Sequence, residues 1–316
     1  MANMQGMRVH IRAGARLQLG FFPYEEGFIG LGLGIEDPHL EVIAQQRLPS
    51  LPADDETGAV ISLLQQAGWE VDGSVAVVRR MGHHMGWGTG TMFNLSVAEA
   101  VCLVSGLSPP VAEIHRLVRP QERTSVGCTL YESGGLVWSD CHRSRQTAWP
   151  ITWGILVAYP RAVDPNWQVF GTREHEAVRQ LQKAVDLKRA RDWKQMMESA
   201  WESVLGVNFP QWLQTFHTLQ QEISRVYTAI PGVPGLDPRS RKLIKWWHEN
   251  LGVEGMQSSW GPAVYAMGPV DQVSLWRANT QERFGSEMRV MVARPTKQGR
   301  LIDWERSERV AYPGSR

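Results

Sequence analysis

The 316-residue sequence predicts an α+β protein built from two domains. Three observations support this. The first half reads mainly as strands with few helices, the segment from about residue 161 to 251 is largely helical, and the C-terminal end returns to strand, helix and strand. Because the character changes near Pro160, the predicted domains are residues 1–160 and 161–316.

Periodicity and turn residues predict the elements of the first domain in chain order. Residues 8–13 (RVHIRA) alternate as a half-buried strand does, and a turn at Pro38 is expected to divide the next two strands. The predicted strands are 8–13, 28–35, 40–45, 74–79, 135–139 and 151–159. The predicted helices are 57–68, 94–107 with Asn94 or Ser96 as its N-cap, and 110–118.

The second domain is predicted in the same way. Its helices are expected at 174–190, 192–205, 209–229, 239–251 and 270–284. Its strands are expected at 263–267 and 289–293, on either side of the last helix. This order of elements is typical of an α+β domain.

Composition excludes several classes of protein. A net charge of +1 offers no broad positive field for nucleic acid, and no run of about 18 apolar residues predicts a membrane helix. The first residues, MANMQGMRVHIRA, lack an apolar signal core, so a cytoplasmic location is expected. The cysteines Cys102, Cys128 and Cys141 have a spacing that favours neither a disulfide framework nor a zinc site.

The strongest local signal is the loop at residues 82–91, GHHMGWGTGT, between a predicted strand and a predicted helix. Glycines allow backbone N–H groups to converge on an anion, and the start of the helix adds its positive end. Thr89 and Thr91 supply hydroxyl donors. The loop therefore predicts a site for phosphate or diphosphate, with a tight turn that binds nothing as the alternative.

Standard nucleotide-binding motifs do not fit this loop. It lacks the Lys-Ser/Thr ending of a P-loop, and Gly86-Trp87-Gly88 has no third glycine where a dinucleotide fingerprint needs one. The loop must therefore be interpreted together with other segments.

Four segments, in this order, resemble one family. They are 15–22 (ARLQLGFF), 82–91, 122–140 (ERTSVGCTLYESGGLVWSD) and 254–265 (EGMQSSWGPAVY), and QSSWGP is the most specific part. The pattern is similar to that of β-ribofuranosylaminobenzene 5′-phosphate synthases, an offshoot of the GHMP kinase fold, over about residues 8–293. The resemblance implies a two-domain GHMP-kinase-like fold. Its N-terminal domain would resemble ribosomal protein S5, and its C-terminal domain would be ferredoxin-like with a helical segment.

The resemblance also implies an activity. Members of the family join 5-phosphoribosyl 1-diphosphate to 4-aminobenzoate and release diphosphate and carbon dioxide. The product is a C-riboside for the synthesis of methanopterin-type cofactors. Three alternatives stay open: a C-nucleoside synthase that uses a heteroaromatic acid, an ATP-dependent small-molecule kinase, and a non-catalytic protein that binds a phosphorylated metabolite. A homodimer is expected, without nucleic-acid or membrane partners.

Candidate site residues follow from the motifs and the resemblance together. Arg16 is a candidate anion clamp, His84 a loop-positioning group or base, and Asp140 a catalytic group that could also hold Mg²⁺, the expected cofactor. Each also has a structural interpretation, as a surface arginine, a hydrogen-bonded loop histidine and a solvated strand-end acid. The expected substrate-binding residues are Gly86, Trp87, Gly88, Thr89, Gly90, Thr91, Ser125, Gly127, Gln257, Ser258 and Ser259.

The chain departs from the usual pattern of this family at several positions. It has Gln18 where the family usually has His, Trp87 where it has Leu, and Thr89 where it has Ser. Asp140-Cys141-His142 replaces Asp-Gly-Gly. Trp87 could cover the ring of the aromatic acceptor or pack in the core. These differences leave the diphosphate loop intact and the identity of the acceptor open.

Overall fold

The computed structural model describes residues 7–46, 55–140, 143–164, 166, 172–231, 233 and 235–306. Its strands are β1 (Met7–Tyr24), β2 (Gly27–Gln45), β3 (Ser74–Arg79), β4 (Leu136–Ser139), β5 (Ser144–Thr147), β6 (Trp153–Pro160), β7 (Met256–Gln257), β8 (Val264–Pro269), β9 (Met288–Ala293) and β10 (Leu301–Arg306). Its helices are α1 (Asp55–Gln66), α2 (Thr89–Val104), α3 (Val111–Val118), α4 (Val126–Ser133), α5 (Thr172–Ala184), α6 (Leu187–Leu205), α7 (Phe209–Thr228), α8 (Pro238–Trp246) and α9 (Val270–Phe284), and a π-helical turn, η2 (Trp247–Leu251), continues α8.

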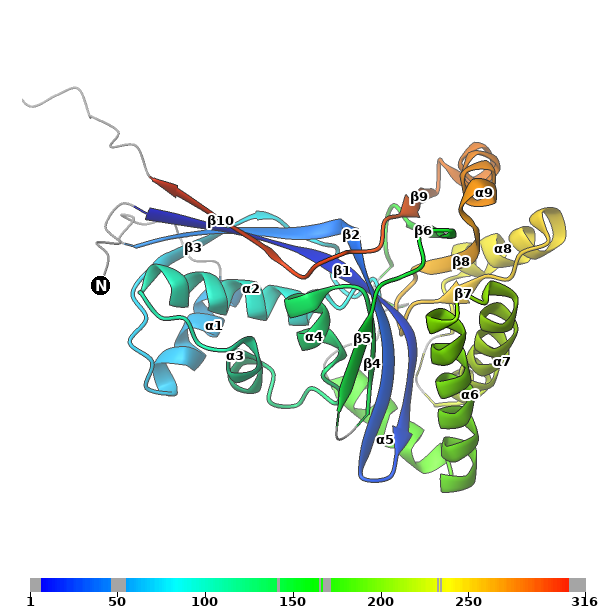
Figure 1. Ribbon diagram of the computed structural model, residues 1–316, viewed down its shortest axis with the longest axis horizontal. Coiled ribbons are helices and arrows are strands. Elements are labelled where there is room, and N and C mark those ends of the chain that lie inside the picture. Colours follow the sequence, from blue (N-terminus) through cyan, green and yellow to red (C-terminus); the bar gives the residue numbers. More distant parts are fainter. Residues whose placement is uncertain are drawn as a thin grey trace, which may run out of the picture.

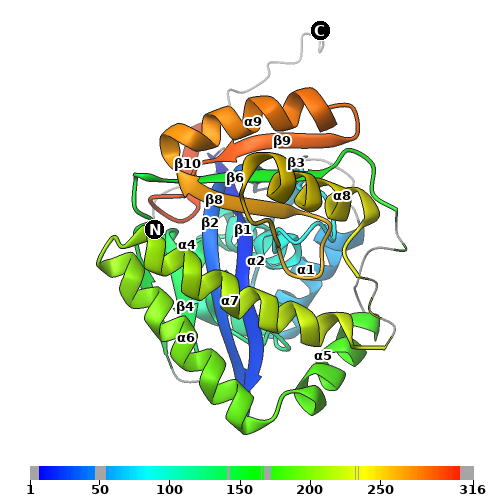
Figure 2. The ribbon, with the colours of Figure 1, turned by 90° about the vertical axis from the view of Figure 1, so that its right-hand side faces the viewer.

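These elements form two antiparallel sheets with helices packed on them, which confirms the α+β prediction (Figure 1). The larger sheet has the order β10-β1-β2-β4-β5, and β3 also pairs with β2. The smaller sheet has the order β7-β8-β6-β9. Helix α9 covers the smaller sheet, while α6 and α7 lie across the long hairpin of β1 and β2 (Figure 2).

The β1–β2 hairpin is far longer than the predicted strands. The turn expected at Pro38 is wrong, because β2 continues through it. The register between β1 and β2 shifts there, so that Gly14 pairs with His39 while Ala15 pairs with Ile35. Residues 36–38 therefore bulge out of the ladder, which is how a strand accommodates a proline without ending.

Strand pairing crosses the expected boundary at Pro160. Strand β6 precedes it but pairs with β8 and β9 in the smaller sheet, and β10 lies far after it but pairs with β1 in the larger sheet. The division of the chain into domains at this residue stays a prediction. The sequence did not predict β10, because apolar and polar residues do not alternate strictly in residues 301–306 (LIDWER).

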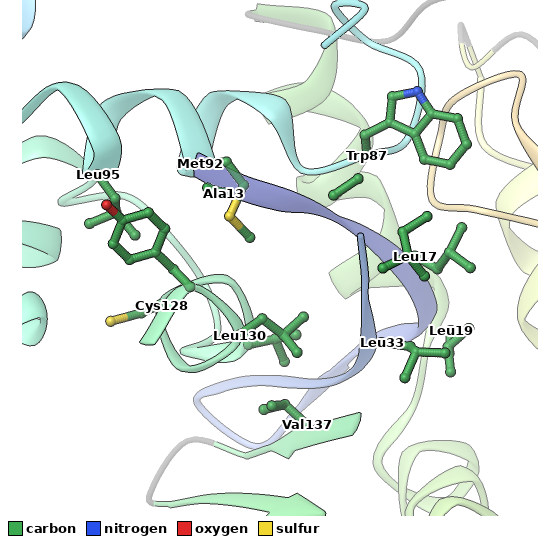
Figure 3. Packing of buried hydrophobic residues seen from close by; sticks show 14 of the residues in the cluster. Ala13, Leu17, Leu19, Leu33, Trp87, Met92, Leu95, Cys128, Leu130 and Val137 are labelled. Atoms are coloured by element: carbon green, nitrogen blue, oxygen red, sulfur yellow. The ribbon is translucent and has the colours of Figure 1, made fainter. Parts of the chain in front are cut away.

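The main core lies between the larger sheet and helix α2, almost all of whose residues are buried. Figure 3 shows part of this core: Met92 of the helix lies beside Ala13 of β1, while Leu17 and Leu33 of the hairpin lie together below Trp87, the residue just before the N-cap of the helix. This packing fixes the helix, and hence the position of its N-terminus, against the sheet.

The helical segment also departs from prediction at one point. The helix expected at 174–190 ends at Ala184, and a new helix, α6, begins at Leu187. Asp186 caps α6 by accepting a hydrogen bond from the backbone N–H of Arg189 at 2.8 Å. Because this cap stabilises the start of a new helix, the predicted single helix is divided in two at this point.

Candidate functional site

A cavity of about 250 Å³ lies where the segments that carry the sequence motifs meet. The loop before α2, strand β1, the segment between α3 and α4, and the segment after β7 all contribute to its wall. The residues that line it include Arg16, Gln18, Phe21, His84, Gly88, Thr89, Gly90, Thr91, Arg119, Glu122, Arg123, Glu174, Ser259, Trp260 and Gly261.

Two of the motifs interlock through their backbones at this cavity. A β-carbon added to Gly86 would lie 2.2 Å from the carbonyl oxygen of Ser258, and one added to Gly261 would lie 2.1 Å from the carbonyl carbon of Met85. Gly86 also has a φ of 91°, which favours glycine. These positions therefore require glycine, because the loop at 82–91 and the segment at 257–261 approach within van der Waals contact.

Ser258 joins the two motifs to strand β1. Its side chain is fully buried, and its hydroxyl accepts a hydrogen bond from the N–H of Gln18 at 3.0 Å and donates one to the carbonyl of Gly86 at 2.8 Å. Because the hydroxyl is buried and makes both hydrogen bonds, Ser258 holds the loop in position. Its side chain has no exposed atom that could make the predicted substrate contact.

Helix α2 begins inside the glycine loop. It starts at Thr89 rather than at the expected Asn94 or Ser96, and Gly88 occupies its N-cap with a φ of 67° and no side-chain hydrogen bond. The first N–H groups of a helix have no acceptor within the helix, so those of Thr89 and Gly90 can bind a ligand at the positive end of the helix dipole. The anion site that the sequence predicts would therefore be part of the helix itself.

The two threonine hydroxyls are already engaged. Thr89 donates to the carbonyl of Gly82 at 3.1 Å, and Thr91 donates to the carboxylate of Glu122 at 3.0 Å. In this arrangement they shape the loop, and the groups left to bind an anion are backbone N–H groups and nearby cations.

A buried carboxylate, Glu122, organises those cations. Its oxygens lie 3.0 Å from Nε2 of His115, 3.4 Å from Nε of Arg119 and 3.7 Å from Nη1 of Arg16. Burial alone would raise the pKa of Glu122, but the hydrogen bond with His115 and the charges of both arginines outweigh it and lower the pKa to about 2. Glu122 is thus a permanent anion that holds two guanidiniums beside the start of α2.

Glu122 should make folding stability depend on acid pH. Because its pKa of about 2 lies below the ordinary value of 4.5, its stabilisation is complete above pH 4.5 and is lost as the pH falls towards 2. We expect Glu122→Gln to reduce the loss of unfolding free energy over this range, measured by urea denaturation. Glu56→Gln, which removes an exposed carboxylate paired with Arg80, should keep the wild-type pH dependence. An unchanged profile for Glu122→Gln would contradict this role.

Arg16 is buried rather than on the surface. Its side chain is 14% exposed, its backbone N–H donates to the carbonyl of Trp87, and burial lowers its pKa. Among the described residues its Nε finds no acceptor. That nitrogen is itself fully buried, although other atoms of Arg16 line the cavity, and the anion-clamp role expected of this residue stays a prediction.

Arg119 and Arg123 line the cavity but were not predicted from the sequence as site residues. The guanidinium of Arg119 lies 3.3 Å from where a β-carbon on Gly90 would be, so it sits beside the first turn of α2. Arg123 lines the same cavity, with Nη1 3.7 Å from Glu174. The sequence signal was the charged run RPQER, residues 119–123, which lies just before the predicted substrate-binding residues Ser125 and Gly127.

Two non-glycine residues that line the cavity have left-handed backbone conformations. His84 and Ser259 each have a φ of 55°. Such strain persists only where the surrounding structure imposes it, and it occurs often at functional sites. Burial lowers the pKa of His84, and the neighbouring His83 adds to that effect, so the ring is held towards its neutral form.

The other predicted contacts are placed differently. Trp87 borders the cavity, but it is 1% exposed and packs edge-on against Tyr159 at 5.2 Å, so most of its indole belongs to the core. The substrate contact expected of it stays a prediction. The amide of Gln257 donates to the carbonyl of Gly261. Ser125 bonds to Ser139 at 2.8 Å. A β-carbon on Gly127 would lie 2.8 Å from Thr91 and 3.0 Å from Glu122, so glycine lets α4 approach the buried carboxylate.

Asp140 lies outside the lining of this cavity. Its carboxylate accepts a hydrogen bond from the backbone N–H of Arg143 at 2.8 Å and is 8% exposed. Its neighbours Cys141 and His142 lie outside the described residues. The catalytic and metal-binding roles expected of Asp140 stay predictions.

Among the described residues, the cavity offers Mg²⁺ few free protein ligands. Within the described ranges, no group of three or more His, Cys, Asp or Glu side chains could hold a metal ion. The oxygens of Glu122 are engaged by Thr91 and His115, and Glu174 faces Arg123. Any Mg²⁺ in the cavity would depend mainly on the oxygens of a bound diphosphate.

One member of each of two stacked aromatic pairs lines the same cavity. Trp260 stacks on Tyr227 at 4.3 Å, and Phe21 stacks on Phe28 at 4.8 Å. The hydroxyl of Tyr227 donates to the carbonyl of Phe21, which links the pairs. Trp260 and Phe21 line the cavity, so they can do what sequence reasoning expected of Trp87.

Comparison with solved structures identifies the fold. The chain superposes on homoserine kinase from Cytophaga hutchinsonii with a TM-score of 0.67 at 13% identity, over 96% of this chain and 99% of the kinase. A structure of MDDEF in complex with MVAPP, AMPPCP and magnesium gives a TM-score of 0.68 at 14% identity, over 95% and 99% of the two chains. The fold is that of the GHMP kinase superfamily. These GHMP neighbours share the fold alone, since their sequences are so different.

One curated relative supports the resemblance that the motifs indicate. The β-ribofuranosylphenol 5′-phosphate synthase of Archaeoglobus fulgidus is 25% identical over 121 residues, which are 37% of this chain and 39% of that protein. The match thus spans well under half of either chain. No protein-family profile matches the sequence. The GHMP fold neighbours and this relative are enzymes.

In the part of the chain that the structure describes, no helix combines the length and the apolar character needed to cross a membrane.

Proposed function

We propose that this protein is a decarboxylating C-ribosyltransferase. It would join 5-phosphoribosyl 1-diphosphate to the carboxylate-bearing carbon of an aromatic acid and release diphosphate and carbon dioxide. One observation carries the proposal: a single cavity combines an anion-binding side, formed by the start of α2 with Arg16, Arg119 and Arg123, and an aromatic side, formed by Phe21 and Trp260. The partial match to a ribofuranosylphenol phosphate synthase supports it.

The anion-binding side suits the diphosphate leaving group. Charge develops on the diphosphate as its bond to ribose C1 breaks, and preorganised N–H groups and guanidiniums stabilise such charge. The N–H groups of Thr89 and Gly90 and the guanidinium of Arg119 are placed for this. Arg16, held by Glu122, adds a second cation. Mg²⁺, where bound, would neutralise further charge on the phosphate oxygens.

The aromatic side suits the second substrate. The flat faces of Trp260 and Phe21 would hold the ring so that the carbon bearing the carboxylate faces ribose C1. The ring carbon forms the new bond to C1 as the bond from C1 to diphosphate breaks. Loss of carbon dioxide then restores the aromatic ring, and no proton transfer at the reacting carbon is needed.

This chemistry is also consistent with the hydrogen bonds and ion pairs that Glu122 already makes. A kinase of this fold would be helped by a carboxylate free to take the proton of an acceptor hydroxyl. The oxygens of Glu122 are occupied by Thr91, His115 and Arg119. A locked carboxylate that positions arginines serves a reaction without proton transfer. The kinase remains the second candidate because the fold neighbours include kinases.

The test is a turnover assay. We expect the protein with phosphoribosyl diphosphate, Mg²⁺ and carboxyl-labelled 4-aminobenzoate or 4-hydroxybenzoate to release diphosphate and labelled carbon dioxide in equal amounts. The hydroxy acid is included because the name of the curated relative specifies a phenol. Release of neither, with binding of phosphoribosyl diphosphate intact, would indicate a heteroaromatic acid. Failure to bind it, together with binding of ATP, would favour the kinase.

A further inference from the structure

A second, smaller cavity adjoins the first and contains no charged residue. Its volume is about 40 Å³, and it shares Gln18, Phe21 and Ser259 with the larger cavity. A water molecule needs about 10–15 Å³ on this measure, so the space suits a substituent at the edge of a ring. The contrast with the arginine-rich side suggests that this pocket takes the uncharged end of the aromatic substrate.

Gln18 lies between the two cavities with a fixed orientation. Its Nε2 donates to the carbonyl of Gly20 and, at 3.0 Å, to the carbonyl of Leu31. A register shift between Gln18 and Gly20 disrupts the strand ladder here, and the carboxamide satisfies carbonyls on both strands at the bulge. The opposite amide orientation would place an oxygen against two carbonyl oxygens, so these contacts determine which atom is nitrogen.

The oxygen of this carboxamide, Oε1, remains available to accept a hydrogen bond. No described residue donates a hydrogen bond to it, and it is not among the fully buried polar atoms that lack a partner. The side chain as a whole is 7% exposed. Gln18 thus presents one rigidly held, uncharged acceptor at the junction of the two cavities.

We infer that Gln18 selects the aromatic substrate by accepting, at Oε1, a hydrogen bond from an amino or hydroxyl group on the ring. This inference rests on the proposed function. An amino or hydroxyl group opposite the carboxylate also supplies the electron density that the ring needs to attack ribose C1. One substituent would therefore serve both reactivity and recognition, and Gln18 would detect its N–H or O–H.

Two nearly identical acids test this inference. 4-(Methylamino)benzoate keeps one N–H, whereas 4-(dimethylamino)benzoate is equally electron-rich but has none. We expect the wild-type protein, with inorganic diphosphate present, to bind the first acid at least about tenfold more tightly, measured by calorimetry. In Gln18→Met the two affinities should fall within about threefold of each other.

The outcomes separate the inference from the proposed function. Equal affinities in the wild-type protein, or a tenfold preference that survives in Gln18→Met, would overturn the role of Gln18 while leaving the ribosyltransferase proposal in place. The wild-type comparison remains decisive even if the variant does not fold. If neither 4-aminobenzoate nor 4-hydroxybenzoate binds to the wild-type protein, this inference is wrong; if phosphoribosyl diphosphate does not bind either, the proposed function is wrong as well.

Discussion

Replacing Arg119 with methionine should weaken the binding of phosphoribosyl diphosphate roughly 10- to 100-fold, because a hydrogen bond to a charged group contributes about 1.5–3 kcal/mol. Its guanidinium lies beside Gly90 in the first turn of α2 and is held there by Glu122. The side chain is 39% exposed, so a ligand can reach it. Calorimetric titration with phosphoribosyl diphosphate would measure the loss.

Arg116→Met is the matched control for this prediction. Arg116 is an exposed residue of α3, one turn before Arg119, and its Nε donates to the carbonyl of Ala112. Its replacement removes the same charge without touching the cavity. If both variants lost affinity equally, the effect of Arg119 would be long-range charge alone, and its place in the anion site would be refuted. Melting temperatures would show that both variants remain folded.

Gly261→Ala should destabilise the fold and disable the anion site together. The added β-carbon would lie 2.1–2.3 Å from three backbone atoms of Met85 and Gly86, so the two motifs must separate. We expect the free energy of unfolding to fall by about 3 kcal/mol or more, as for severe overpacking. Since the loop at 82–91 leads directly into α2, binding of phosphoribosyl diphosphate should also be lost. Urea denaturation and calorimetry would measure the two effects.

Gly58→Ala provides the comparison for that substitution. Gly58 lies in α1, where no atom outside the local helix comes within 4 Å of an added β-carbon. Alanine favours a helix over glycine, so this variant should be more stable by about 0.5–1 kcal/mol and should bind normally. A Gly261→Ala protein as stable as the wild type would mean that the loop and the segment after β7 are not in the close contact described.

The sequence predicted the glycine loop, its place between a strand and a helix, and its partner motif QSSWGP. It did not predict how these segments use their polar groups. Thr91 and Ser258 are hydroxyl residues in small-residue segments, a pattern typical of ligand contacts, yet their hydroxyls bond to Glu122 and Gly86. Whether a hydroxyl faces a ligand or a carbonyl depends on what the rest of the chain brings near it.

The sequence likewise left the role of the tryptophans open. Trp87 lies in the loop and Trp260 in the most specific motif, and the sequence offered no basis for choosing which of them meets the substrate. Both line the cavity, but the structure buries Trp87 against Tyr159 and leaves Trp260 partly exposed, stacked on Tyr227. The residues that decide this belong to β6 and α7, far from either tryptophan in the chain.

Local pattern determined the fold class and most helices and strands, and it predicted an anion site, because periodicity and glycine conformations act over a few neighbouring residues. Tertiary structure alone decided that Glu122 gathers Arg16, His115 and Arg119, since these side chains come from β1, from α3 and from the segment that follows α3. It also decided the return of β10 to β1 and the position of Gln18 between two cavities. Such arrangements depend on contacts between distant segments, which only the folded chain brings together.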